Sequence, residues 1–309
     1  MELQRVESLT VERFLSEFVA PAVPCIIADG MRGWSGTRQW SPDWFRAELG
    51  AEYAQIYNDR FDLVNITTLA EYMDEYFSAG TPGEAVPYVR WYTKLKDEEF
   101  IWADDAFERL RGLWSKPYFL PDSGYLLPFC MEPDTISPVD AHFPARSIFV
   151  SGPGAATRLH YDPWGSDSIL FQIHGLKRWT MYAPEQAQYL RSSDGRYVDL
   201  ANPDLSRFPN FHQAKRTFEF LLRGGETIFV PAGWVHEVET LEGSISLTWN
   251  FVHRVAADRY FSYLASGESV GHDLEVLRFF YSKHVPPTAT AEEIADYVHG
   301  NMVSMAEIH

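Results

Sequence analysis

The chain is poor in cysteine, in long apolar segments and in basic residues. Only two cysteines occur in 309 residues, Cys25 and Cys130, and they form no CxxC motif. We therefore expect two buried thiols instead of a disulfide framework or a cysteine metal site. No run of about 18 apolar residues is present, so no membrane span is expected. The first residues do not resemble a secretory leader, and the cytoplasm is the expected compartment.

Positive charge is scarce: 26 Lys and Arg stand against 43 Asp and Glu, a formal net charge of −17. Binding to phosphate backbones needs concentrated Lys and Arg, so no nucleic-acid partner is expected. The acidic field is compatible with a cationic peptide substrate. Aromatic residues, in contrast, make up 15 % of the chain, which is enough for a large core and an aromatic-lined pocket.

The hydrophobic period changes twice along the chain. Helical patterns occupy 10–20, the segment from Ser41, and 68–77, with a buried strand near 24–28. Short strands separated by Gly, Pro and Asp turns then follow, and these are typical of a closed or sandwiched antiparallel fold. They are expected at 86–92, 146–151, 168–173, 177–182, 226–230 and 244–251. Residues 96–124 are irregular and suit a covering insert.

After Asn250 the helical pattern returns, at 258–265, 273–281 and 290–298. The chain is therefore predicted to be mainly β, with helical decoration at both ends. Residues 1–253 would form one domain, including the N-terminal helical and strand extension. Residues 254–309 would form a helical tail that either packs on the barrel or mediates a homodimer, and the sequence leaves both possibilities open.

Three residues suggest a metal site. His160 and Asp162 are two residues apart, so on a strand, or just leaving one, their side chains point the same way. A distant His236 would complete a set of two histidines and one carboxylate. That set leaves open coordination positions and suits ferrous iron in oxygenases, whereas catalytic zinc is a poorer match. Alone, a His-x-Asp pair is weak and is more often a surface or turn pair.

Two strands strengthen this interpretation. Lys177 shares a strand face with Trp179 and Met181, and a buried lysine needs an anion, which a bound dicarboxylate would supply. Alternatively, Lys177 lies at a strand end and reaches water. The segment 244–251 alternates strictly and places Ser246, Thr248 and Asn250 on one face. That polar face is either exposed to solvent or lines a polar cavity.

Several ordered motifs resemble those of the Jumonji-C, or cupin-like, oxygenases that depend on iron(II) and 2-oxoglutarate. They are Thr157-x-x-His160-x-Asp162-Pro-x-Gly, Gln172-x-x-Gly175-x-Lys177-Arg-Trp179, Gly225-Glu-Thr-x-Phe-Val-Pro231-x-Gly-Trp234-x-His236 and Thr248-x-Asn250-Phe. The segment from Asn202 to Asn210 is similar to one in the asparaginyl hydroxylase of hypoxia-inducible factor. The motifs around Asp162 and Lys177 look closer to the Jumonji lysyl hydroxylase.

The resemblance implies a double-stranded β-helix, the jelly-roll or cupin barrel, with Fe(II) held by His160, Asp162 and His236. It also implies that Lys177 binds the distal carboxylate of 2-oxoglutarate, with help from Thr157. Three further residues match positions around the cosubstrate in some relatives: Tyr88, Asn250 and Thr248. One departure is that relatives often carry an Asn between the metal Asp and the Lys, where this chain reads Ser166-Asp-Ser168-Ile-Leu170.

The implied reaction consumes O2 and 2-oxoglutarate, releases succinate and CO2, and hydroxylates a C–H bond. A protein or peptide side chain is the expected target. A small molecule or natural product is the alternative, and N-demethylation follows from the same chemistry. A non-catalytic cupin-type binding module and a metal-dependent isomerase or hydrolase are alternatives from other classes. Lys177 argues against the isomerase or hydrolase, because those reactions need no dicarboxylate cosubstrate.

Overall fold

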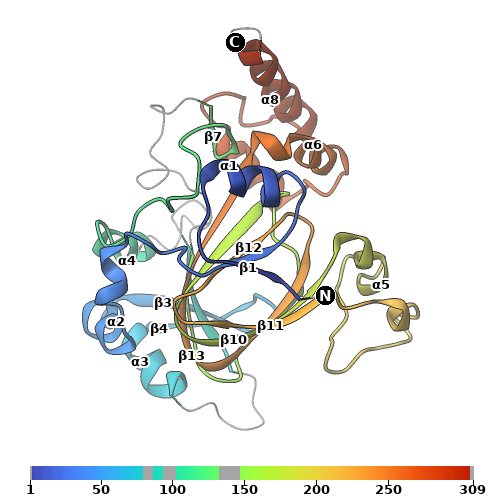
Figure 1. Ribbon diagram of the computed structural model, residues 1–309. Coiled ribbons are helices and arrows are strands. Elements are labelled where there is room, and N and C mark those ends of the chain that lie inside the picture. Colours follow the sequence, from blue (N-terminus) through green and yellow to red (C-terminus); the bar gives the residue numbers. More distant parts are fainter. Residues whose placement is uncertain (1, 79–85, 93–101, 132–146, 307–309) are drawn as a thin grey trace.

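The computed structural model describes residues 2–78, 86–92, 102–131 and 147–306, and one large sheet runs through them (Figure 1). Along its main path, neighbouring strands are antiparallel except for the parallel pair β1–β2. The path is β1 (Gln4–Val6), β2 (Cys25–Ile27), β12 (Thr227–Val230), β10 (Asp167–Tyr182), β13 (Val235–His253), β8 (Ser147–Ser151), β5 (Tyr88–Tyr92), β3 (Tyr53–Tyr57) and β4 (Leu63–Thr68). The prediction of a mainly β, antiparallel fold with helices at both ends is confirmed.

The long strands β10 and β13 form the centre of the sheet and change partners along their length. The first part of β10 pairs with β12, and the second part pairs with β11 (Phe218–Arg223). The registers shift between Gln172 and Lys177, where Gly175 has a φ of +82°. A Cβ at Gly175 would lie 2.2 Å from the carbonyl oxygen of Gly243, so only glycine fits this crossing. The sequence predicted two strands here, whereas the structure joins them into one.

The N-terminal helices pack on this sheet and fill its main core. Phe14, at the end of α1 (Val11–Phe14), contacts the rings of Phe119, Phe229 and Phe251. The chain continues in η1 (Leu15–Val19), η2 (Ser35–Arg38), α2 (Pro42–Leu49), α3 (Leu69–Tyr72), η3 (Met73–Phe77) and α4 (Trp102–Arg109). Of these, α2, α3 and α4 gather beside β3 and β4 (Figure 1).

The expected helix starts are present, with Thr10, Ser41 and Thr68 each accepting a backbone N–H through the side chain. One expectation was wrong: part of the insert 96–124 is helical, because α4 lies within it. Residues 96–101 of that insert lie outside the described residues. Both cysteines are buried free thiols, as expected. None of the helices in the described part of the chain is long and apolar enough to cross a membrane.

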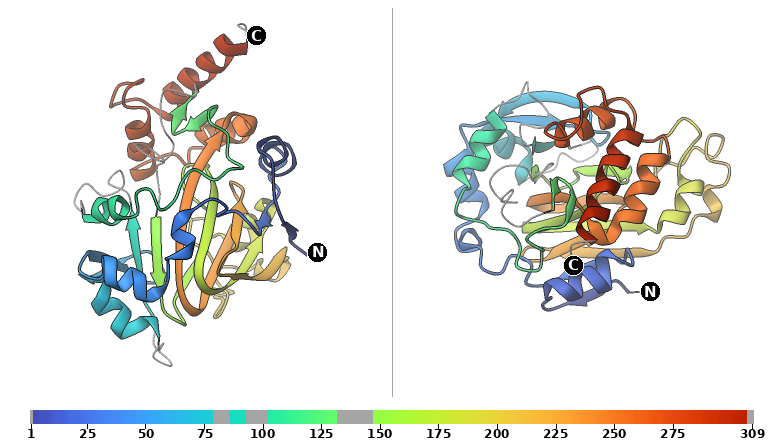
Figure 2. Two further views of the ribbon diagram at one scale, coloured as in Figure 1. Left: turned by 60° about the vertical axis from the view of Figure 1, so that its left-hand side comes forward. Right: turned by 90° about the horizontal axis from the view of Figure 1, so that it is seen from above.

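The C-terminal helices cover one end of the sheet (Figure 2, right). They are η6 (Arg254–Ala256), α6 (Ala257–Ala265), α7 (His272–Phe280) and α8 (Ala291–Ala306), and they pack with β6 (Tyr125–Leu127) and β7 (Phe129–Cys130). Arg259 donates hydrogen bonds to the carbonyls of Val19 (2.8 Å) and Ala20 (2.9 Å) and lies 3.5 Å from Asp167. Trp164, two residues after Asp162, is buried in the same apolar cluster as Tyr260. The tail therefore packs directly behind the Asp162 turn.

A final excursion lies between β10 and β11. It contains η4 (Pro184–Gln186), α5 (Ala187–Leu190) and η5 (Phe211–Gln213). Its apolar residues, including Leu190, Val198 and Phe208, form a small core of their own with Leu159 of β9 (Ala156–His160). This packing places the excursion next to the strand that carries His160.

Candidate metal centre and cosubstrate pocket

The three predicted ligands come together where β9 meets β13. His160 is the last residue of β9, Asp162 follows two residues later, and His236 is the second residue of β13. The strands pair antiparallel with His160 opposite His236, which places the two rings 4.3 Å apart. The nearest carboxylate oxygen of Asp162 lies 3.9 Å from Nε2 of His236. One donor atom of each residue lies within 4.8 Å of the others.

Backbone carbonyls fix the orientation of both imidazoles. Nδ1 of His160 lies 2.7 Å from the carbonyl oxygen of Arg158, and Nδ1 of His236 lies 3.0 Å from that of Trp234. A carbonyl only accepts, so each Nδ1 carries a proton and Nε2 is the nitrogen that a metal would use. Burial, reinforced by neighbouring His236, lowers the pKa of His160 to about 3. The imidazole of His160 is therefore neutral at physiological pH, which is the state that binds a metal.

The carboxylate of Asp162 is also held in place. Ser168 donates a hydrogen bond to it at 2.7 Å. Burial alone would raise the pKa of Asp162, but the two histidines and hydrogen bonds from Ser168 and Asn250 outweigh this effect and lower it. Two imidazoles and one carboxylate are the donor set that ferrous iron takes in oxygenases, with positions left for a cosubstrate. The residues present fit that metal.

Lys177 lies in a separate small pocket with the chemistry for a dicarboxylate. The side chain is only 5 % exposed, and its Nζ donates to Ser246 Oγ at 2.9 Å. Tyr88, Thr157 and Phe149 line the same pocket, together with Ser151 and Thr240. Burial lowers the pKa of Lys177 to about 7. Among the described residues no carboxylate pairs with Lys177, so a bound anion would provide the missing counter-charge.

The other residues predicted from the sequence have different surroundings. Asn250 hydrogen-bonds Asp162, and its side-chain amide also donates to Ser166 Oγ at 3.0 Å. Thr248 places its hydroxyl 3.5 Å from the carbonyl oxygen of Ser147 and does not line the Lys177 pocket. Two serines that were not among the predicted site residues contact the key residues: Ser168 donates to Asp162, and Ser246 accepts from Lys177. The alternation of the segment 244–251 was a usable signal for Ser246.

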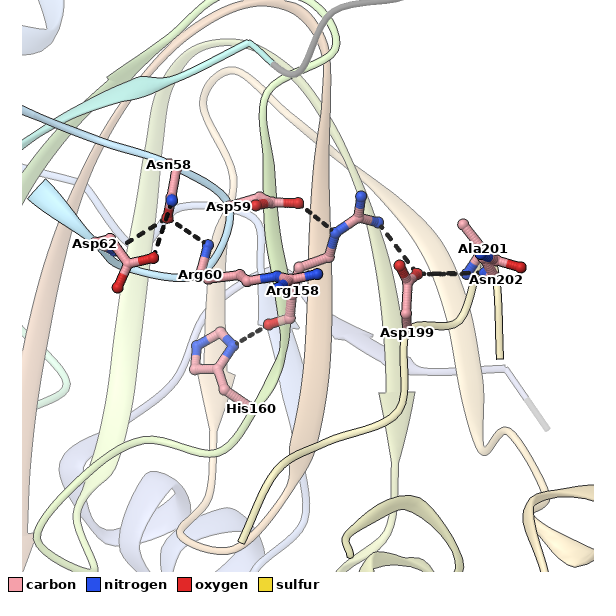
Figure 3. Close-up of polar contacts among 9 residues, drawn as sticks. All are labelled: Asn58, Asp59, Arg60, Asp62, Arg158, His160, Asp199, Ala201 and Asn202. Atoms are coloured by element: carbon pink, nitrogen blue, oxygen red, sulfur yellow. Dashed lines mark hydrogen bonds and ion pairs between the residues drawn. The ribbon is translucent and has the colours of Figure 1, made fainter. Parts of the chain in front are cut away.

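A cleft of about 730 Å³ opens beside His160. One wall is formed by residues 59–62 of the turn between β3 and β4, and the other by part of the excursion, within residues 195–208. Arg158 lies between the walls: its Nε bonds Asp59 at 2.7 Å, and its Nη1 lies 3.8 Å from Asp199 (Figure 3). Of the three candidate ligands, His160 therefore borders a polar cleft that has acidic and basic groups on both sides.

Comparison with known proteins agrees with this geometry. The cupin-like domain family matches residues 11–257. The 2-oxoglutarate and iron-dependent oxygenase JMJD4 of Gallus gallus is 27 % identical over 275 residues, which cover 81 % of this chain and 60 % of the relative. The tRNA wybutosine-synthesizing protein 5 of Homo sapiens is 25 % identical over 274 residues, which cover 85 % of this chain and 82 % of the relative.

The Arginine-specific demethylase JMJ22 of Arabidopsis thaliana is 26 % identical over 263 residues, which cover 82 % of this chain but 46 % of the relative. The chain therefore spans about half to four-fifths of the length of these relatives. The family match covers most of the chain and includes all three metal-binding candidates and Lys177. The chain belongs to the cupin-like, Jumonji-C-type family of iron(II)- and 2-oxoglutarate-dependent oxygenases.

Proposed function

We propose that this protein is an Fe(II)- and 2-oxoglutarate-dependent oxygenase that hydroxylates a C–H bond in a protein or peptide side chain. O2 is the second cosubstrate, and succinate and CO2 are the coproducts. The observation that carries the proposal is the pairing of two sites. A set of two histidines and one aspartate lies within 4.8 Å, and a buried lysine without a carboxylate partner among the described residues lies in a pocket of hydroxyl groups.

The residues divide the work as follows. His160, Asp162 and His236 hold the iron, and Lys177 binds the distal carboxylate of 2-oxoglutarate with Thr157 and Tyr88 beside it. When bound there, Fe(II) and 2-oxoglutarate would supply, with O2, the oxidising chemistry for hydroxylation of a substrate carbon. No side-chain general base is needed for this chemistry.

The chain's own contribution is orientation and exclusion of water. The carbonyls of Arg158 and Trp234 fix the histidine tautomers, and Ser168 and Asn250 hold the Asp162 carboxylate. Such outer partners commonly change metal affinity 10- to 100-fold when removed. Thr248 and Asn250 complete the polar face of β13 on this side of the sheet. The burial of Lys177 keeps water from competing with the cosubstrate carboxylate.

The cleft supports a peptide more than a nucleic acid. Its walls carry acidic and basic residues in equal number, Asp59, Asp62, Asp199 and Asp204 against Arg60, Arg158, Arg196 and Arg207, whereas phosphate backbones need a positive surface. The net charge of −17 adds to that argument. A small molecule or natural product is the runner-up, because a cleft of this volume also suits ligands of drug size.

Two further expectations belong with this proposal. Residues 254–309 act as a tail of the same unit as residues 1–253, supported by the contacts of Arg259 and the shared apolar cluster with Trp164. Dimerisation through the tail is the alternative. The cytoplasm is the proposed compartment, and the two buried free thiols suit a reducing environment.

The direct test is turnover. The purified protein is incubated with Fe(II), 2-oxoglutarate and O2 in the presence of peptide and metabolite libraries, and succinate is measured together with product mass. A gain of one oxygen atom indicates hydroxylation, whereas formaldehyde with loss of a methyl group indicates N-demethylation. If neither product forms but metal and 2-oxoglutarate bind, the non-catalytic binding module is the correct alternative.

A further inference from the structure

The turn that joins β3 to β4 forms the wall of the cleft nearest the metal site. It consists of Asn58, Asp59, Arg60, Phe61 and Asp62, and all but Asn58 line the cleft with His160. Figure 3 shows the turn on one side of the cleft, with His160 and Arg158 beside it. The roles proposed above do not use this turn.

Hydrogen bonds within the turn hold it in one conformation. The Asn58 side-chain oxygen accepts the N–H groups of Arg60 (2.9 Å) and Asp62 (3.0 Å), and the Asn58 N–H donates to the Asp62 carbonyl at 3.0 Å. Phe61 is thereby held at a φ of +67°, in the left-handed region that residues with a bulky side chain rarely occupy. Strain of this kind is characteristic of positions where the conformation serves a site.

The strained conformation places the Phe61 ring against a metal ligand. The rings of Phe61 and His160 are 5.0 Å apart, edge to face at 75°. Phe61 is only half-buried, so part of its ring faces the cleft. A substrate in the cleft therefore lies beside this ring and His160, and an aliphatic group is the chemistry that an aromatic face accommodates.

Arg158 fastens the turn to the strand of the metal ligand. Its guanidinium bonds the Asp59 carboxylate, its backbone N–H donates to the Asp59 carbonyl at 3.1 Å, and its own carbonyl accepts from His160 Nδ1. The turn and the metal ligand are therefore positioned by the same residue. Because both the side chain and the backbone of Asp59 are bonded to Arg158, the turn is held in a fixed position beside the metal ligand.

Among the described residues, most charged groups of the cleft are paired with one another or with neighbours. Asp59 and Asp199 are paired with Arg158, Asp62 accepts from Asn58, and Asp204 caps the backbone of Ser206. Arg196 and Arg207 both lie against Asp194. Arg60 is exposed, and within the described part of the chain no acidic group pairs with it. Its backbone N–H is bonded to Asn58 within the turn, whereas its guanidinium is open to a ligand.

We propose that the turn of residues 58–62 is the substrate-recognition element of this cleft. Its ligand is a peptide segment with an aliphatic side chain placed beside Phe61 and an acidic residue that pairs with Arg60. This inference rests on the proposed oxygenase function and names its substrate class. A single available guanidinium suits one carboxylate, whereas a nucleic acid presents many phosphates to a chain whose net charge is −17.

The test measures binding without turnover. Protein loaded with Fe(II) and 2-oxoglutarate under argon is titrated into fluorescent peptides with a varied central residue. Asp or Glu is moved through the flanking positions, and each acidic peptide has an Asn or Gln counterpart. In the native protein the acidic member of the best pair should bind about three- to fivefold tighter, as expected for a partly exposed ion pair.

Two variants, each with a matched control, test whether Arg60 and Phe61 are responsible for peptide binding. Arg60→Glu should abolish or invert the preference for the acidic peptide, whereas Arg38→Glu, at another exposed arginine, should leave it unchanged. Phe61→Gly keeps the left-handed conformation but removes the ring, so it should fold normally and bind the best peptide about tenfold more weakly. Ala22→Gly relieves a similar φ of +56° away from the cleft and should have no effect on binding.

The proposal is wrong if the acidic preference is absent or survives Arg60→Glu, or if Phe61→Gly folds and binds like the native protein. Tight binding of single-stranded RNA instead of any peptide would also overturn it. The visible absorption of the same anaerobic samples distinguishes this failure from that of the proposed function. If 2-oxoglutarate produces no absorption band in the native protein, the oxygenase assignment has failed, whatever the peptides do.

Discussion

Replacing Lys177 by methionine should stabilise the protein while removing its affinity for 2-oxoglutarate. The lysine is 5 % exposed, and burial lowers its pKa from the usual 10.5 to about 7. A difference of this size corresponds to roughly 5 kcal/mol of unfavourable free energy for the buried cation. Loss of the hydrogen bond to Ser246 destabilises the variant by about 1 kcal/mol, which offsets part of this gain. We expect Lys177→Met to raise the free energy of unfolding by about 2–4 kcal/mol at pH 7.

The sign of the pH dependence follows from the lowered pKa of Lys177. Below about pH 7 the lysine is protonated in both the folded and the unfolded protein, so the full penalty is present. As the pH rises from about 7 to the unfolded pKa of about 10.5, the folded protein loses the proton first and the penalty disappears. The stability advantage of the methionine variant should therefore be largest at pH 7 or below and small at pH 10.

Urea unfolding at pH 7 and pH 10 measures this advantage, and 2-oxoglutarate titration measures the loss of binding. Millimolar 2-oxoglutarate should raise the melting temperature of the native protein and leave that of Lys177→Met unchanged. Lys283→Met, at an exposed lysine, is the matched control and should change neither quantity. A methionine variant that is less stable at pH 7, or that is still stabilised by 2-oxoglutarate, would refute the placement of Lys177 in the cosubstrate pocket.

Other predictions concern the ligands and the tail. Asp162→Ala should abolish succinate formation and leave no measurable Fe(II) binding in equilibrium dialysis, because it removes the anionic donor. Ser168→Ala should weaken Fe(II) binding 10- to 100-fold in the same assay, since the Asp162 carboxylate loses its 2.7 Å partner. Arg259→Met should lower the free energy of unfolding by about 2–4 kcal/mol at pH 7, because it strips the buried Asp167 of its cation. The loss should be smaller at pH 5, since burial raises the pKa of Asp167 to about 6, and an equal loss at both pH values would contradict this account.

Short-range patterns in the sequence marked His160, Asp162 and Lys177 as candidates for the site. His160 and Asp162 are close in the chain, and Lys177 stands out as a charge on an apolar strand face, so local periodicity marks them. His236 needed the resemblance to a family, because nothing local distinguishes it. The structure brings all three donor residues within 4.8 Å and buries Lys177.

Features that depend on tertiary pairing were not predictable. Gly175 looks like a strand end in the sequence, whereas in the structure it allows β10 to continue past Gly243. The role of Arg158 depends on Asp59, which is 99 residues away in the chain. The positive φ of Phe61 arises from hydrogen bonds of Asn58, and the sequence of such a turn resembles that of any polar hairpin.

The most direct test of the central claim is an anaerobic titration of metal-free protein with Fe(II) and then 2-oxoglutarate. If His160, Asp162 and His236 hold iron beside a cosubstrate bound by Lys177, a weak visible charge-transfer band should appear on addition of 2-oxoglutarate. It should saturate at one equivalent of iron and be absent in Asp162→Ala. Folded native protein that binds Fe(II) without producing this band would contradict the assignment of the site.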